Sequence, residues 1–124
     1  MKYIYILVGG AAGSLLRFII SEYISAKYSS DFPVGIFFVN ILGALIIGFL
    51  FGYLSDNELL NDKLRFLLFI GLLGGFTTFS SFALENMRLI KDGLILTSLL
   101  YIMLTNVLGI VVAFAGYFTA LKIR

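Results

Sequence analysis

The sequence predicts an all-α integral membrane protein with four transmembrane helices. Hydrophobic residues make up 60% of its 124 residues and charged residues only 13%, whereas about a quarter of a typical soluble domain is charged. The mean hydropathy is +1.05. Four apolar segments are each long enough to cross the hydrocarbon core, which takes about 20 residues. We therefore expect one four-helix domain over residues 1–124, with helices at about 3–24, 34–54, 66–89 and 94–121.

The first apolar segment has a second interpretation. Lys2 precedes an apolar run that ends in small residues at positions 11–14, a pattern also found in secretory signal peptides. The apolar character resumes beyond Ser14, and cleavage there would leave three helices. We therefore interpret the segment as the first transmembrane helix.

The composition also excludes several classes of function. The chain has no Cys and no His, and its formal net charge is only +2. Thiol nucleophiles, common zinc sites and imidazole proton shuttles are therefore absent. No Lys/Arg cluster is dense enough for a nucleic-acid partner. We expect a protein that is not an enzyme and whose surroundings are the lipid bilayer.

The third predicted helix contains the most unusual pattern in the chain, Gly-Gly-Phe-Thr-Thr-Phe-Ser-Ser-Phe at residues 74–82. Lipid offers no hydrogen-bond partners, so an interruption of a membrane helix must be buried against protein or water. Such interruptions often form ion or substrate sites. The pattern predicts that the third helix is broken in the middle of the membrane, at a binding site.

Polar residues at membrane depth suggest the kind of solute. Arg17 is either a side chain that reaches back to the interface or a positive charge at a vestibule. Asn40 either joins helices or presents its NH₂ group to an anion. Tyr101 and Thr105 are four residues apart, hence on one helix face, although the hydroxyls of Thr and Ser in membrane helices often bond to their own backbone. No carboxylate lies convincingly in mid-helix, which favours an anion.

Topology and assembly remain open from charge alone. With four crossings, one side carries five Lys and Arg residues and the other three. The count fits either cytoplasmic termini or insertion in both orientations, which would permit an antiparallel homodimer. Glycines four residues apart provide surfaces for close helix approach, within one subunit or between two. These pairs are Gly9 and Gly13, Gly48 and Gly52, and Gly71 and Gly75.

Residues 74–82 resemble the third-helix signature of the CrcB/Fluc family of fluoride channels. Two further runs support the resemblance: residues 9–13 followed by Arg17, and residues 39–43 preceded by Gly35. The similarity extends over the whole chain. It departs from the family pattern at Ile36, where a Thr is usual, and at Gly109, where a further hydroxyl is common.

The resemblance implies passive, uncoupled fluoride export that lowers intracellular fluoride toxicity, by a dual-topology (antiparallel) homodimer in a bacterial inner membrane. It implies a fluoride pathway formed by Asn40, Phe79, Phe82, Ser81, Tyr101 and Thr105. The edges of the two phenylalanine rings would contact the anion; without the resemblance, packing against lipid or core is the simpler explanation. It also implies a structural sodium ion bound by the backbone carbonyls of Gly74 and Thr77.

Two other functions remain as alternatives. A small dual-topology, proton-coupled multidrug exporter has a similar size and would need a carboxylate in its first helix, for which Glu22 is the candidate. A subunit that assembles with other chains but transports nothing would move no ion in purified form.

Overall fold

A computed structural model describes residues 1–56 and 60–124. The described residues form helices and connecting turns, with no strand among them. Four helical spans in this part of the chain are long and apolar enough to cross a membrane. They are α1 (Lys2–Lys27), α2 (Val34–Leu54), a composite third span (Asp62–Lys91) and α6 (Ile95–Ile123). The predicted all-α class with four spans is confirmed.

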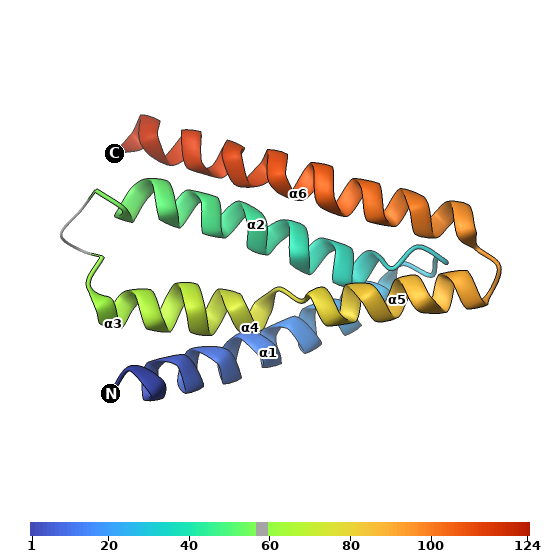
Figure 1. Cartoon of the computed structure of the whole chain (residues 1–124), viewed down its shortest axis with the longest axis horizontal. Coiled ribbons are helices and arrows are strands. Elements are labelled where there is room, and N and C mark those ends of the chain that lie inside the picture. The colour runs from blue at the N-terminus through green and yellow to red at the C-terminus, as the bar shows by residue number, and fades with distance from the viewer. Residues whose placement is uncertain (57–59) are drawn as a thin grey trace.

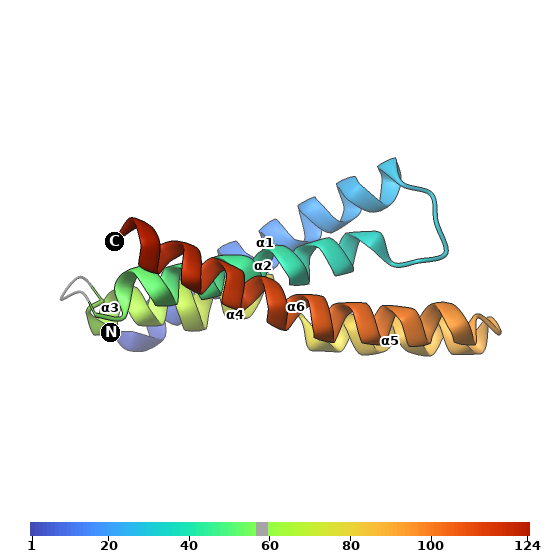
Figure 2. The same ribbon diagram turned by 90° about the horizontal axis from the view of Figure 1, so that it is seen from above.

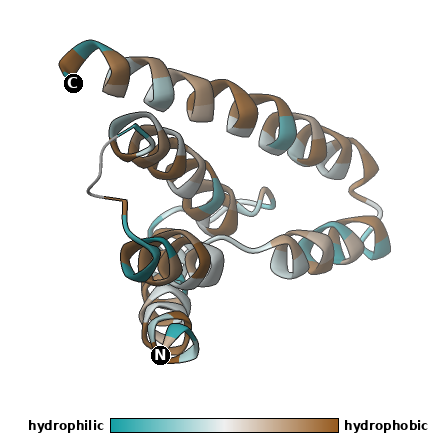
Figure 3. Cartoon of the chain, turned by 60° about the vertical axis from the view of Figure 1, so that its left-hand side comes forward, coloured by the Kyte–Doolittle hydropathy of each residue, from teal (hydrophilic) through white to brown (hydrophobic). Residues whose placement is uncertain are grey.

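The four spans lie roughly side by side, with both chain termini at the same end of the molecule (Figure 1). The α1–α2 connection and the turn before α6 lie at the opposite end. α6 packs mainly against α2, and α1 packs mainly against the first half of the third span. Hydrophobic residues extend along all four spans, as expected for helices that face lipid (Figure 3).

The third span consists of four helical pieces. α3 (Asp62–Leu64) continues into a π-helix, η1 (Arg65–Leu73), then into α4 (Gly74–Phe76), and the span ends with α5 (Phe79–Lys91). Between α4 and α5 the backbone is extended, with φ/ψ of −79°/153° at Thr77 and −149°/121° at Thr78. The two halves of the span are therefore joined by two non-helical residues.

Glycines bring pairs of helices into backbone contact. A Cβ at Gly13 of α1 would overlap the Leu72 carbonyl of η1, and a Cβ at Gly48 of α2 would overlap the backbone of Ala113 in α6. The other glycines of the predicted pairs also approach helices of the same chain. Of the two predicted uses, these surfaces therefore serve packing within the subunit.

α5 is the least covered part of the third span. It contacts α6 and, over a few residues, α2, while α1 diverges from it (Figure 2). A turn with Gly93 at φ 78° connects it to α6. Its exposed side chains include Phe79, Leu84, Met87 and Ile90. This helix thus presents a large apolar face outside the subunit.

Candidate functional site

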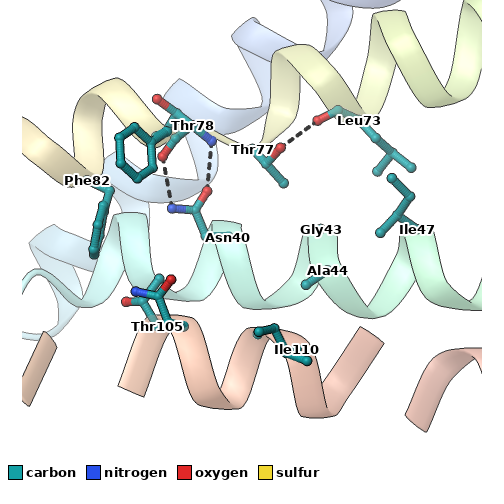
Figure 4. A pocket seen from close by; sticks show the side chains of 13 residues that line it. Asn40, Gly43, Ala44, Ile47, Leu73, Thr77, Thr78, Phe82, Thr105 and Ile110 are labelled. Carbon is teal, nitrogen blue, oxygen red and sulfur yellow. Dashed lines mark hydrogen bonds between the residues drawn. The ribbon is translucent and has the colours of Figure 1, made fainter. Parts of the chain in front are cut away.

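The side chain of Asn40 in α2 is hydrogen-bonded to the backbone of Thr78. Asn40 Nδ2 donates to the Thr78 carbonyl over 3.1 Å, and the Thr78 N–H donates to Asn40 Oδ1 over 2.8 Å (Figure 4). The amide therefore pairs with the extended backbone in the way that a neighbouring strand would. The second N–H of the Asn40 amide takes no part in this pair and is left as a hydrogen-bond donor.

The threonine side chains complete the connection between α4 and α5. Thr78 Oγ1 accepts a hydrogen bond from the Ser81 N–H at 3.1 Å, so Thr78 is the N-cap of α5. Thr77 Oγ1 donates to the Leu73 carbonyl at 2.9 Å. Asn40 Oδ1 and Thr78 Oγ1 each accept from a backbone amide, of Thr78 and of Ser81, and so divert it from its helical acceptor. In a continuous helix the Thr78 N–H would bond to Gly74 and the Ser81 N–H to Thr77.

A cavity of about 350 Å³ lies beside this connection, between α2, the two halves of the third span, and α6 (Figure 4). Its wall is largely apolar, with polar side chains gathered on α2, on the connection and on α6. The lining residues are Asn40, Gly43, Ala44, Ile47, Leu73, Thr77, Thr78, Phe79, Phe82, Thr105, Asn106, Gly109 and Ile110. No charged residue is among them.

The two phenylalanines of the cavity differ in their surroundings. Phe82 is 7% exposed and packs against Tyr101, with ring centroids 5.0 Å apart and planes inclined by 57°. The ring centroids of Phe79 and Phe82 are 5.6 Å apart, yet Phe79 is 79% exposed. Phe82 is thus fixed by its own subunit, and Phe79 projects from it.

Two hydroxyl groups of α6 are buried without a hydrogen-bond partner in the described residues: Tyr101 Oη and Thr105 Oγ1. Tyr101 is fully buried, in contact with Phe82 and Phe32. Thr105 lines the cavity one turn further along the helix. A buried hydroxyl without a partner is costly and needs a reason. Thr105 Oγ1 is therefore available to a polar solute in the cavity, whereas Tyr101 is not among the residues that line it.

A second cleft, of about 290 Å³, lies between α1 and α5. Arg17, Glu22, Ser81 and Glu85 are among its lining residues. The structure thus divides the residues of the predicted pathway. Asn40, Phe79, Phe82 and Thr105 share the main cavity, with the Tyr101 ring packed against Phe82, whereas Ser81 lies with Arg17 in the cleft.

Two polar residues near the site were not singled out from the sequence. Asn86 of α5 and Ser98 of α6 are buried and hydrogen-bonded to each other. Asn86 precedes Asp92, in the turn between the two helices, by as many residues as Ser98 follows it. In an αα-hairpin such positions face one another, and this symmetry is the signal that would have identified the pair.

Comparisons with known proteins identify the family of the chain. Residues 4–117 match the model of the family described as CrcB-like protein, Camphor Resistance (CrcB). A protein of Aquifex aeolicus named fluoride-specific ion channel FluC is 47% identical over 112 residues, 90% of each chain. Proteins of the same name from Flavobacterium psychrophilum and Helicobacter pylori (strain J99) are 40% and 36% identical. The matches cover 94% of each chain for the first, and 97% of this chain and 93% of the relative for the second.

These relatives match nearly the whole chain, and the four apolar spans are those of a multi-pass membrane protein. The chain belongs to the CrcB-like family.

Proposed function

We propose that the protein is a fluoride-selective channel, which lets cytoplasmic fluoride leave a bacterial cell down its electrochemical gradient. The names of its relatives support this function. The observation that carries it for this chain is the cavity of uncharged hydrogen-bond donors and aromatic rings, with two buried hydroxyls that have no partner among the described residues. Thr105 lines the cavity, and Tyr101 packs against its Phe82. Donors in a largely apolar space suit a small anion, and no acidic residue is among the described residues that line the cavity.

In this proposal the anion follows the donors of α2 and α6. The remaining Nδ2–H of Asn40 and the hydroxyls of Thr105 and Tyr101 replace part of its hydration shell. The positive ring edges of Phe79 and Phe82 contact it between these donors. Arg17 and Ser81 belong to the cleft beside α1, where the Arg17 charge raises the local anion concentration.

The active form is an antiparallel homodimer in the inner membrane. Support comes from α5, whose apolar face, including Phe79 at 79% exposure, lacks cover within the subunit. The small difference in Lys and Arg count between the two ends permits both orientations. Two oppositely inserted copies would bring their α4–α5 connections together at the middle of the bilayer. Each Phe79 would then be covered by the partner.

A structural sodium ion fits the same connection. In a continuous helix, the Gly74 and Thr77 carbonyls would accept from the N–H groups of Thr78 and Ser81. These N–H groups donate instead to Asn40 Oδ1 and Thr78 Oγ1. Carbonyl oxygens are suitable ligands for a hard cation. The two carbonyls would hold the ion at the dimer axis, where it would fix the connections of both subunits. Its role would be structural, with no part in fluoride selection.

Growth of a fluoride-sensitive bacterial strain that lacks its own exporter tests the function. We expect the chain to restore growth on fluoride medium and Phe82→Ile to weaken the rescue strongly. Glu22→Gln should still restore growth, because Glu22 is exposed and does not line the cavity. Failure of the unaltered, membrane-inserted chain to protect the strain would contradict the proposal. Drug efflux by the unaltered chain that is abolished in Glu22→Gln would favour the multidrug exporter.

A further inference from the structure

Asn86 connects two helices through both ends of its amide. Its Nδ2 donates to the Phe82 carbonyl over 2.9 Å, and its Oδ1 accepts from Ser98 Oγ over 2.8 Å. Asn86 and Ser98 are both buried. The hydroxyl of α6 is thus linked through a single side chain to the backbone of Phe82.

Phe82 is held by amide side chains on both sides. Thr78, Phe82 and Asn86 are four residues apart, so they share one face of α5. One turn before Phe82, Thr78 is paired with Asn40 of α2. One turn after it, Asn86 is paired with Ser98 of α6. The ring between them is the one that packs against Tyr101.

We propose that Asn86 and Ser98 form a positioning pair that sets the height and rotation of Phe82 against Tyr101, and so the width of the ion route. The proposal rests on the fluoride conduction proposed above. Neither side chain lines the cavity, so the pair acts on the ion only through Phe82. Asn40 fixes the start of α5, and the pair fixes its second turn.

The need for such a pair follows from the packing of α5. Apolar side chains would let α5 slide or rotate against α6 at little cost, because dispersion contacts have no preferred direction. Hydrogen bonds in an apolar environment are directional and costly to leave unmade. The pair therefore permits one register of the two helices. Few other contacts restrain α5.

Fluoride efflux from liposomes with full-length protein tests the pair, after the unaltered chain has given its reference rate. Ser98→Ala should slow efflux roughly three- to twentyfold, the range that corresponds to the loss of one interhelical hydrogen bond in a membrane protein. Ser98→Thr keeps the hydroxyl and should restore most of the rate. Thr119→Val is the matched control, since the Thr119 hydroxyl donates to the Ala115 carbonyl of its own helix and to no other group in the described residues. An equal loss in Ser98→Ala and Ser98→Thr would overturn the proposal.

A double variant distinguishes positioning of Phe82 from general stability. In a Phe82→Ile background, Ser98→Ala should cause little further loss, because the ring on which the pair acts is already gone. If the two reductions in fluoride efflux rate multiply, as they would for independent sites, the pair does not act through Phe82 and the proposal is wrong.

A spectroscopic measurement tests the positioning without conduction. In protein labelled with 3-fluorotyrosine, the ¹⁹F resonance lost in Tyr101→Phe identifies Tyr101. Ser98→Ala should shift or broaden this resonance, and Ser98→Thr should return it. If Ser98→Ala leaves the Tyr101 resonance unchanged, the positioning role of Asn86 and Ser98 is refuted, even when the unaltered chain conducts fluoride. A failure of the unaltered chain to move fluoride would instead refute the proposed function.

Discussion

Asn40 and Thr78 exchange two hydrogen bonds, of 3.1 and 2.8 Å, between the middle of α2 and the extended residues that separate α4 from α5. The pair gives the non-helical backbone the partner that lipid cannot supply. It also prevents the Thr78 N–H from donating to the Gly74 carbonyl, as it would in a continuous helix. The form of the third span therefore depends on one side chain of the second.

Asn40→Leu should destabilise the protein strongly. The substitution leaves the Thr78 N–H and carbonyl without partners, and each such group costs about 1–3 kcal/mol. Chemical unfolding in detergent, followed by circular dichroism, measures the change in the free energy of unfolding. Asn106→Leu is the control, because Asn106 is exposed and bonds to the Ile102 carbonyl of its own helix. Equal free energies of unfolding for the two variants would contradict this role of Asn40.

Phe79→Ile and Phe82→Ile should both slow fluoride efflux but differ in stability. Phe82 loses its contact with the Tyr101 ring, and such aromatic pairs contribute about 0.5–1.5 kcal/mol. Phe79 is mostly exposed in the subunit, so its replacement should change the free energy of subunit unfolding by less than about 0.5 kcal/mol. Unfolding curves measure the effect on stability, and efflux from liposomes measures the effect on conduction. Normal flux in both variants would mean that the rings only pack.

Tyr101→Phe and Thr105→Val should lower fluoride efflux without a loss of stability. Each removes a buried hydroxyl that has no partner in the described residues, while the shape of the side chain is largely kept. The removal of a lone polar group should leave stability unchanged or raise it by about 1 kcal/mol. Flux and thermal unfolding of the same preparations decide the point. A clear drop in melting temperature would indicate a structural hydroxyl.

Gly109→Ser should be tolerated and should extend the line of hydroxyls along α6. A Cβ at Gly109 would meet only Ile41 Cδ1, at 3.8 Å, which is an ordinary contact. Ser is also a better helix former than Gly by a few tenths of a kcal/mol. We expect normal expression and fluoride efflux at or above the original rate.

Gly48→Ser provides the contrast, because its Cβ would overlap the Ala113 backbone. This variant should destabilise the packing of α2 on α6 and reduce the yield of folded protein in size-exclusion chromatography. If Gly109→Ser were as poorly folded as Gly48→Ser, the open space beside Gly109 would be in question.

The sequence predicted the parts of the fold that depend on local composition. Four apolar runs, each long enough for a membrane, became four helical spans. The Gly/Thr/Ser pattern at 74–82 predicts a break in the third helix, because its chemistry is unusual for lipid; a break in the middle of the membrane stays a prediction. Two extended residues lie within that stretch. The π-helix before it has no comparable signal, since its residues after Arg65 are apolar side chains and Gly71.

The parts that depend on distant partners could not be predicted. Asn40 was expected either to join helices or to meet an anion, and it joins α2 to a backbone group 38 positions away. The spacing of Ser81 and Phe82 could not reveal that they face different cavities. Nor does spacing indicate that Phe82 is covered and Phe79 is not.

Fluoride and chloride efflux from the same batch of liposomes, recorded with ion-selective electrodes, is the most direct test of an anion channel that selects fluoride. The vesicles contain only the purified, full-length chain, and protein-free vesicles give the background leak. We expect rapid fluoride efflux and chloride efflux at the background rate. Efflux of both anions at similar rates, or of neither, would contradict a fluoride-selective channel.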